Sequence, residues 1–269
     1  MTLGSRWRSA FATICDARQT PSLEQAPASQ ARRRLLVMQQ ADQLVEVLEH
    51  AASTLEHALR EMHAESRVQE LALGAALLTP RRLRGIGAMV EMGLAYEAQA
   101  LCRGVIELAI NLGWVGDDED RALRVQLRGP RDQLKFFRKA SAAGLLVAAD
   151  TFKTLEREIA KMDAGRSLSD LPNLAERARE TRLFSQEQAT DLYLLPFARM
   201  SAVVHMDWIH VAHVAEGQDF VRLLLEDTVA GTMFVVGAIA RAFTSIAALE
   251  SLCCDLQGAL RRSEVDAVD

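Results

Sequence analysis

The fold of this chain is decided by the stretch YEAQALCRGVIELAINLGW, residues 96–114. Its apolar side chains recur at helical spacing, which predicts a helix that is buried over most of its surface. Arg103 and Glu107 interrupt the apolar pattern four residues apart, so they share one face, and Tyr96 and Asn111 extend the same stripe. Burial of charge is costly without a partner, and this face is therefore expected to meet other polar groups.

The expected partner is a second stretch, LLPFARMSAVVH, at residues 194–205. Arg199 stands six positions before His205 in this apolar run, and Ser201 shares a helix face with His205. Each stretch thus carries two isolated ionisable groups. We predict that this pair and the charged pair of residues 96–114 form one polar cluster across a shared cleft.

Composition favours helices packed on helices. The chain has 269 residues, of which 49% are hydrophobic and only 5% aromatic, and alanine, leucine, arginine and glutamate dominate. We therefore predict an all-α protein with a sizeable core. The net charge of -5 gives no global reason to bind nucleic acid, so such binding requires a local basic patch.

The predicted architecture is an antiparallel helical bundle without a sheet. Its main helices are expected at residues 35–62, 86–115, 186–213 and 225–262. The first of these has apolar residues alternating by three and four, which indicates a long coiled-coil-like helix.

Proline and small polar residues predict where the linker lies and where helices end. Residues 1–30 contain prolines among small polar residues and are interpreted as an arm and linker, followed by a single helical domain at 31–269. Pro80 and Pro130 are expected to end helices, because proline removes a backbone donor.

The most membrane-like stretch is Val229–Leu249. Arg241 divides it, and the charge-free run Thr228–Ala240 is shorter than the roughly 18–20 residues that a span requires. We therefore predict a buried core helix and no membrane association. Residues 1–18 lack the pattern of a secretory signal, and the four cysteines show no disulfide framework, so a cytoplasmic location is expected.

The chemistry of the Arg199 and His205 pair suits metal-independent phosphodiester cleavage. A histidine near neutral pKa accepts a proton from a hydroxyl, and a guanidinium holds a phosphate. One alternative is a non-catalytic helical dimerisation or adaptor protein, in which these groups only fix helix register. Another is a metal-dependent hydrolase that uses a cluster of acid and histidine side chains, namely His205, Asp207, His210 and His213. A single helix cannot aim all of these at one ion.

These motifs resemble those of a known superfamily. The spacing of Arg199 and His205 is similar to the R-x(4-6)-H motif of the HEPN superfamily. The run LCRGVIE at residues 101–107, followed by Trp114, together with Phe197 before the motif, resembles a family of HEPN-like prokaryotic proteins that carry an R-x-x-x-E helix. The resemblance covers roughly residues 81–262.

The resemblance implies an all-α homodimer that acts as an endoribonuclease in a toxin–antitoxin or phage-defence setting, with no metal or other cofactor. Arg199 would contact the phosphate, and His205 would transfer a proton at the ribose 2′-hydroxyl. An antitoxin or a defence protein is the implied protein partner. The supporting residues of the cleft would be Arg103, Glu107, Ser201, Tyr96 and Asn111. Met200 stands where active members often carry a polar residue, so RNA binding without cleavage is an alternative.

Overall fold

The computed structural model of the chain describes residues 28–145, 148–163, 170–193, 197, 218–244 and 246–265. Every regular element in these ranges is a helix, which confirms the all-α prediction. The helices are α2 (Ala28–Ala58), α3 (Arg67–Glu91), α4 (Ala95–Val115), α5 (Glu119–Ala142), α6 (Ala149–Asp163), α7 (Leu174–Arg179), α8 (Gln186–Leu192), α11 (Gln218–Ala242) and α12 (Ala247–Val265).

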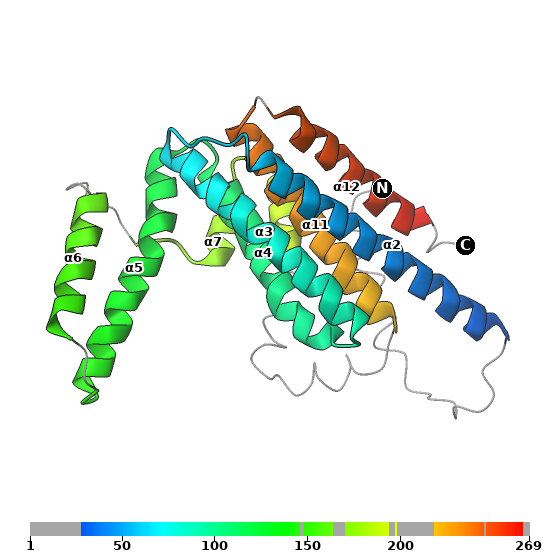
Figure 1. The fold of residues 1–269 in the computed structure, drawn as a ribbon, viewed down its shortest axis with the longest axis horizontal. Helices are drawn as coiled ribbons and strands as arrows, with labels where there is room; N and C mark the ends of the chain where they lie inside the picture. The colour runs from blue at the N-terminus through cyan, green and yellow to red at the C-terminus, as the bar shows by residue number, and fades with distance from the viewer. Residues whose placement is uncertain are drawn as a thin grey trace.

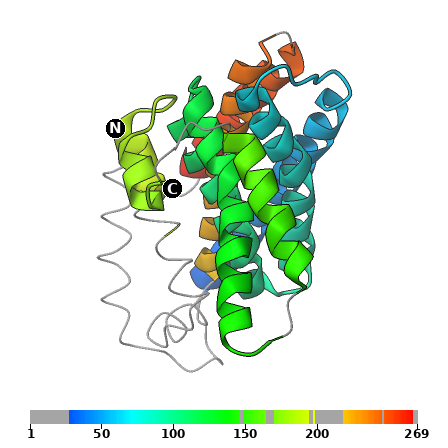
Figure 2. The same ribbon diagram turned by 90° about the vertical axis from the view of Figure 1, so that its left-hand side faces the viewer.

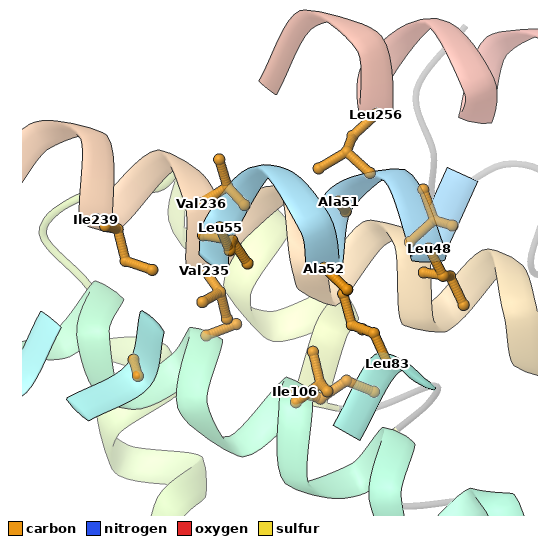
Figure 3. Close-up of a cluster of buried hydrophobic side chains, with 14 of the residues drawn as sticks. Leu48, Ala51, Ala52, Leu55, Leu83, Ile106, Val235, Val236, Ile239 and Leu256 are labelled. Carbon is orange, nitrogen blue, oxygen red and sulfur yellow. The ribbon is translucent and has the colours of Figure 1, made fainter. Parts of the chain in front are cut away.

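The core lies between α2, α3, α4, α11 and α12 (Figure 1). Helices α2, α3 and α4 alternate in direction, and so do α11 and α12, whereas α11 runs parallel to α4: Leu224 lies beside Cys102, and Gly231 lies beside Ile106. Figure 3 shows side chains from all five helices meeting in one cluster. Among them are Leu55 of α2, Leu83 of α3 and Ile106 of α4, each with at most 1% of its surface exposed. Small residues such as Ala51 and Ala52 let the helices approach closely.

Helix α11 is the centre of this bundle. Its segment Phe220–Ala242 is long and apolar enough to cross a membrane, but 61% of its most apolar window is buried inside the protein. The apolar side chains face α4, α2, α3 and α12. This position agrees with the prediction of a core helix.

The prediction that Pro80 ends a helix is wrong, because α3 runs from Arg67 to Glu91 with Pro80 inside it. The break lies at Gly93, whose φ of 75° is accessible to glycine at little cost, so the single helix predicted at residues 86–115 is instead divided between α3 and α4. Pro80 is buried where α3 packs against its neighbours. We attribute the tolerance of the missing hydrogen bond to this packing.

Two other predicted boundaries are corrected. Helix α5 passes through Pro130, whereas a break was expected there. The predicted helix at residues 225–262 is divided into α11 and α12. Phe243 and Ile246, at the corner between them, are both buried in the core, so the turn keeps apolar side chains inside.

Helices α5 and α6 form a hairpin that stands beside the bundle (Figures 1 and 2). Its base is fixed by a small cluster of Trp114, Val115 and Ala122. Asp118 caps α5 by accepting from the backbone N–H groups of Asp120 and Arg121. The hairpin therefore begins from a rigid junction with α4.

Candidate functional site

A cleft of about 510 Å³ lies between α4, α5 and the segment that carries α7. This volume is within the roughly 300–1,000 Å³ typical of ligand pockets. The residues that line it are Arg103, Glu107, Arg124, Arg128, Arg131, Asp132, Lys135, Asp170, Leu171, Pro172, Asn173, Leu174, Arg177 and Phe197.

Helix α4 contributes Arg103 and Glu107, which share a face because they are four residues apart. The Arg103 guanidinium carbon lies 4.8 Å from the centroid of the Phe197 ring, a cation–π distance. Phe197 in turn stacks on Tyr193, with 5.6 Å between ring centroids. Glu107 does not pair with Arg103: its Oε1 accepts from Arg128 Nη1 at 2.6 Å.

Helix α5 contributes a basic wall. Its four cations stand at steps of four, three and four, so they share one face, and they are Arg124, Arg128, Arg131 and Lys135. Arg128 pairs with Glu107 and also approaches Asp132, with Nε and Oδ2 3.6 Å apart. Arg131 approaches Asp163 and Asp170 at 3.5 and 3.8 Å.

Arg177 of α7 also lines the cleft. It is the most deeply buried of the lining cations, with 3% of its surface exposed. Its Nε and Nη1 are buried and have no hydrogen-bond partner in the part of the chain that the structure describes. Burial lowers the pKa of Arg177 to about 10, with a smaller contribution from the positive charge of Arg128. The side chain is therefore still a cation at neutral pH.

The charge of the cleft opposes that of the whole chain. Six of its lining side chains are arginine or lysine and three are aspartate or glutamate, a local excess of three positive charges. The full chain carries a net charge of -5. Such a local excess attracts anions, and an arginine fork suits phosphate oxygens.

The structure brings two of the predicted site residues, Arg103 and Glu107, to this cleft. Asn111 follows one turn later on α4 and is buried, and its Oδ1 has no hydrogen-bond partner among the described residues. Asn111 and Tyr96 are not part of the cleft lining. Phe197 belongs to the lining and precedes the predicted motif arginine by two positions in the sequence.

The remaining predicted site residues lie outside the described residues. These are Arg199, Ser201 and His205, and the alternative metal ligands Asp207, His210 and His213. Their roles stay predictions. In the described ranges no group of three histidine, cysteine or acidic side chains is arranged to hold a metal ion.

The sequence analysis missed the basic wall of α5 and the buried Arg177. The helical spacing of the four cations of α5 was a usable signal, because it places them on one face. No comparable signal exists for Arg177. It follows Glu176 in a short helix of six residues that also contains Arg179, where an arginine is usually exposed to solvent.

The chain matches a family of proteins whose function is unknown. No curated protein and no solved structure matches the chain. Residues 70–221, more than half of the chain, match a family of unknown function, DUF5677. This range contains every residue that lines the cleft. The chain therefore belongs to the family of unknown function DUF5677.

Proposed function

We propose that this protein is a HEPN-like cytoplasmic effector that binds RNA in the basic cleft and cleaves it without a metal ion, in a toxin–antitoxin or phage-defence setting. The observation that carries the proposal is the excess of cations in a cleft on an acidic chain. Phosphates dominate the affinity of proteins for nucleic acids, so a local basic surface is the feature that RNA binding requires.

The place of Arg103 and Phe197 supports this proposal. Arg103, of the R-x-x-x-E helix, contacts Phe197, of the stretch that carries the proposed catalytic residues Arg199 and His205. Arg103 and Phe197, one residue from each of the two sequence segments that carry the HEPN resemblance, thus meet at one wall of the cleft. Glu107 is engaged by Arg128, which fixes the orientation of that basic side chain.

In the proposed reaction, His205 accepts the proton of a ribose 2′-hydroxyl as its oxygen attacks the adjacent phosphorus. The bond from phosphorus to the 5′-oxygen breaks, and this oxygen takes a proton from a second acid. The products are a 2′,3′-cyclic phosphate and a 5′-hydroxyl. Arg199 stabilises the negative charge that builds on the phosphoryl oxygens.

A homodimer would supply the second acid. One subunit carries one His205, whereas two-fold symmetry can bring a second copy to the same substrate. Ser201 would orient His205, and Arg103 would contact a neighbouring phosphate. An antitoxin or defence protein would regulate this dimer.

The test is an RNA cleavage assay in EDTA with purified protein at a concentration where it is dimeric. We expect wild-type protein to produce 2′,3′-cyclic phosphate ends. Arg199→Ala and His205→Ala should lower the rate by roughly a hundredfold or more, because each removes a proposed catalytic group. Arg261→Ala, an exposed arginine of α12, is the matched control and should cleave like wild type.

Circular dichroism must show that all variants are folded. Equal background cleavage by wild type and both variants would contradict the nuclease proposal. If RNA nevertheless binds, the protein is a binding module in which Met200 has replaced a catalytic polar residue. If RNA does not bind either, the result favours the alternative of a non-catalytic dimerisation or adaptor protein.

A further inference from the structure

Arg177 carries a buried charge that the described part of the protein does not satisfy. Two of its guanidinium nitrogens have no partner there, although the side chain is 3% exposed. Arg121 makes a useful contrast. It donates to the carbonyl oxygens of Trp114 and Glu180 at 2.7 and 3.1 Å, and it stacks on the Trp114 ring at 4.7 Å. Arg121 thus has hydrogen-bond acceptors and a stacking partner within the fold, as expected of an arginine with a structural role.

The local fold does not account for Arg177. Helix α7 is held by a capping box in which Asn173 and Glu176 exchange side-chain and backbone hydrogen bonds. Glu107 acts on Arg177 through space, but it accepts no hydrogen bond from Arg177 Nε or Nη1, and one of its two carboxylate oxygens, Oε1, accepts from Arg128 at 2.6 Å. An uncompensated buried charge destabilises a protein, so this arginine needs a counter-ion that α7 and Glu107 do not supply.

A second cation of the same cleft also has a buried donor without a hydrogen-bond partner among the described residues. Arg124 also lines the cleft, and its buried Nε has no partner within the described residues. Guanidinium N–H groups only donate, so a group that pairs with them must be an acceptor. An oxyanion has several acceptor oxygens and can accept from more than one arginine of a cleft, and phosphate matches the planar guanidinium fork.

We infer that Arg177, with Arg124, forms a preorganised phosphate-binding subsite on the wall of the basic cleft. The inference rests on the proposed function for its natural ligand, and deepens it by naming a phosphate contact separate from Arg199 and His205. The ligand group is a phosphate of RNA, either a terminal monoester or a backbone diester. Binding energy at this subsite positions the strand in the cleft.

The experiment measures binding of inorganic phosphate by thermal melting and calorimetric titration, with sodium chloride matched in ionic strength. Phosphate should raise the melting temperature of the wild-type protein, because a ligand of the native state stabilises it. Arg177→Met should lose this rise and bind phosphate roughly tenfold more weakly or worse. Arg177→Lys keeps the positive charge but lacks the planar guanidinium group, so its affinity for phosphate should lie between those of wild type and Arg177→Met.

A second readout separates this role from a structural one. Without phosphate, Arg177→Met should melt at a higher temperature than wild type, because it removes an unpaired buried charge. Arg121→Met is the matched control. It should melt at a lower temperature, since it removes satisfied hydrogen bonds, and should keep its response to phosphate.

The source of the phosphate is distinguished with short 2′-O-methyl RNA, which lacks the attacking hydroxyl and is not cleaved. Tighter binding of the 5′-phosphorylated form identifies a terminal phosphate, and equal binding of phosphorylated and unphosphorylated forms identifies the backbone. Failure of wild type to bind phosphate, or an equal response in Arg177→Met, would overturn the inference. Loss of cleavage in His205→Ala with phosphate binding intact would leave this subsite standing.

Discussion

At the scale of single residues, Gly113 shows how closely α4 approaches the chain that follows α7. A Cβ atom at this position would lie 2.7 Å from a ring carbon of Phe184 and 2.9 Å from Thr181 Oγ1. The Phe184 ring cannot move freely, because it packs edge-on against Phe234 with 4.4 Å between centroids. A side chain at position 113 must therefore displace packed groups.

We predict that Gly113→Ala lowers the free energy of unfolding by about 1–3 kcal/mol through overpacking. Gly74→Ala is the matched control, because a Cβ at Gly74 of α3 would meet no atom within 4 Å. That variant should instead gain about 0.5–1 kcal/mol, since alanine favours a helix interior. Urea unfolding of both variants tests the prediction, and destabilisation of equal size in both would contradict it.

Helix periodicity predicted a polar stripe of which Arg103 and Glu107 line the cleft, whereas Tyr96 and Asn111 do not, and it missed the cleft residues that depend on how helices dock. Arg103 and Glu107 share a face because of their spacing in one helix, which periodicity reports directly. Burial of Arg177 depends on where a six-residue helix comes to rest, and no local pattern reports that. The ion pair of Glu107 with Arg128 joins α4 to α5, and no pattern within either helix predicts it.

At the scale of elements, Arg84 of α3 forms ion pairs with two glutamates of α2. Its Nε lies 3.0 Å from Glu49 Oε1, and its Nη2 donates to Glu56 Oε2 at 2.9 Å. Hydrogen bonding to Arg84 holds the pKa of Glu56 below its ordinary value of 4.5. Folding thus favours the ionised form of this carboxylate.

A pH dependence follows from this shift. The Glu56 pKa is lowered in the folded state, so its stabilisation is fully present above about pH 4.5 and is lost as the pH falls through the folded value. Glu56→Gln should therefore melt below wild type at neutral pH, with the difference vanishing in acid. Glu46→Gln, on the same helix but without an ion pair among the described residues, is the control. A difference that persists unchanged at about pH 3 would contradict this account.

The prolines explain two of the errors in element boundaries. Propensity predicts a break at Pro80 and Pro130, since each removes one hydrogen bond. Tertiary packing overrides this local cost in α3, where Pro80 is buried. The true turn between α3 and α4 is at Gly93, with positive φ, which a sequence analysis focused on proline passes over.

At the scale of the whole molecule, composition and periodicity were sufficient to predict an all-α bundle, because helical propensity and apolar spacing agree along most of the chain. The position of the α5–α6 hairpin beside the bundle was not predictable in the same way. It depends on the junction at Trp114, where a buried indole anchors α5 to α4. Because the junction sets the position of α5 beside α4, it also positions the α5 cations that line the cleft.

The measurement that tests the central claim most directly is the affinity for single-stranded RNA, in EDTA, as a function of salt concentration. We compare wild type with Arg103→Gln in the cleft and with Arg261→Gln on α12, which lies across the bundle from α5 (Figure 1). If the cleft holds the RNA backbone, Arg103→Gln weakens binding and reduces the logarithmic salt slope by about 0.7, the value for one phosphate contact to a single strand. Arg261→Gln should retain the wild-type affinity and slope. Equal affinities and slopes for all three folded proteins would contradict the assignment of the cleft as the RNA-binding site.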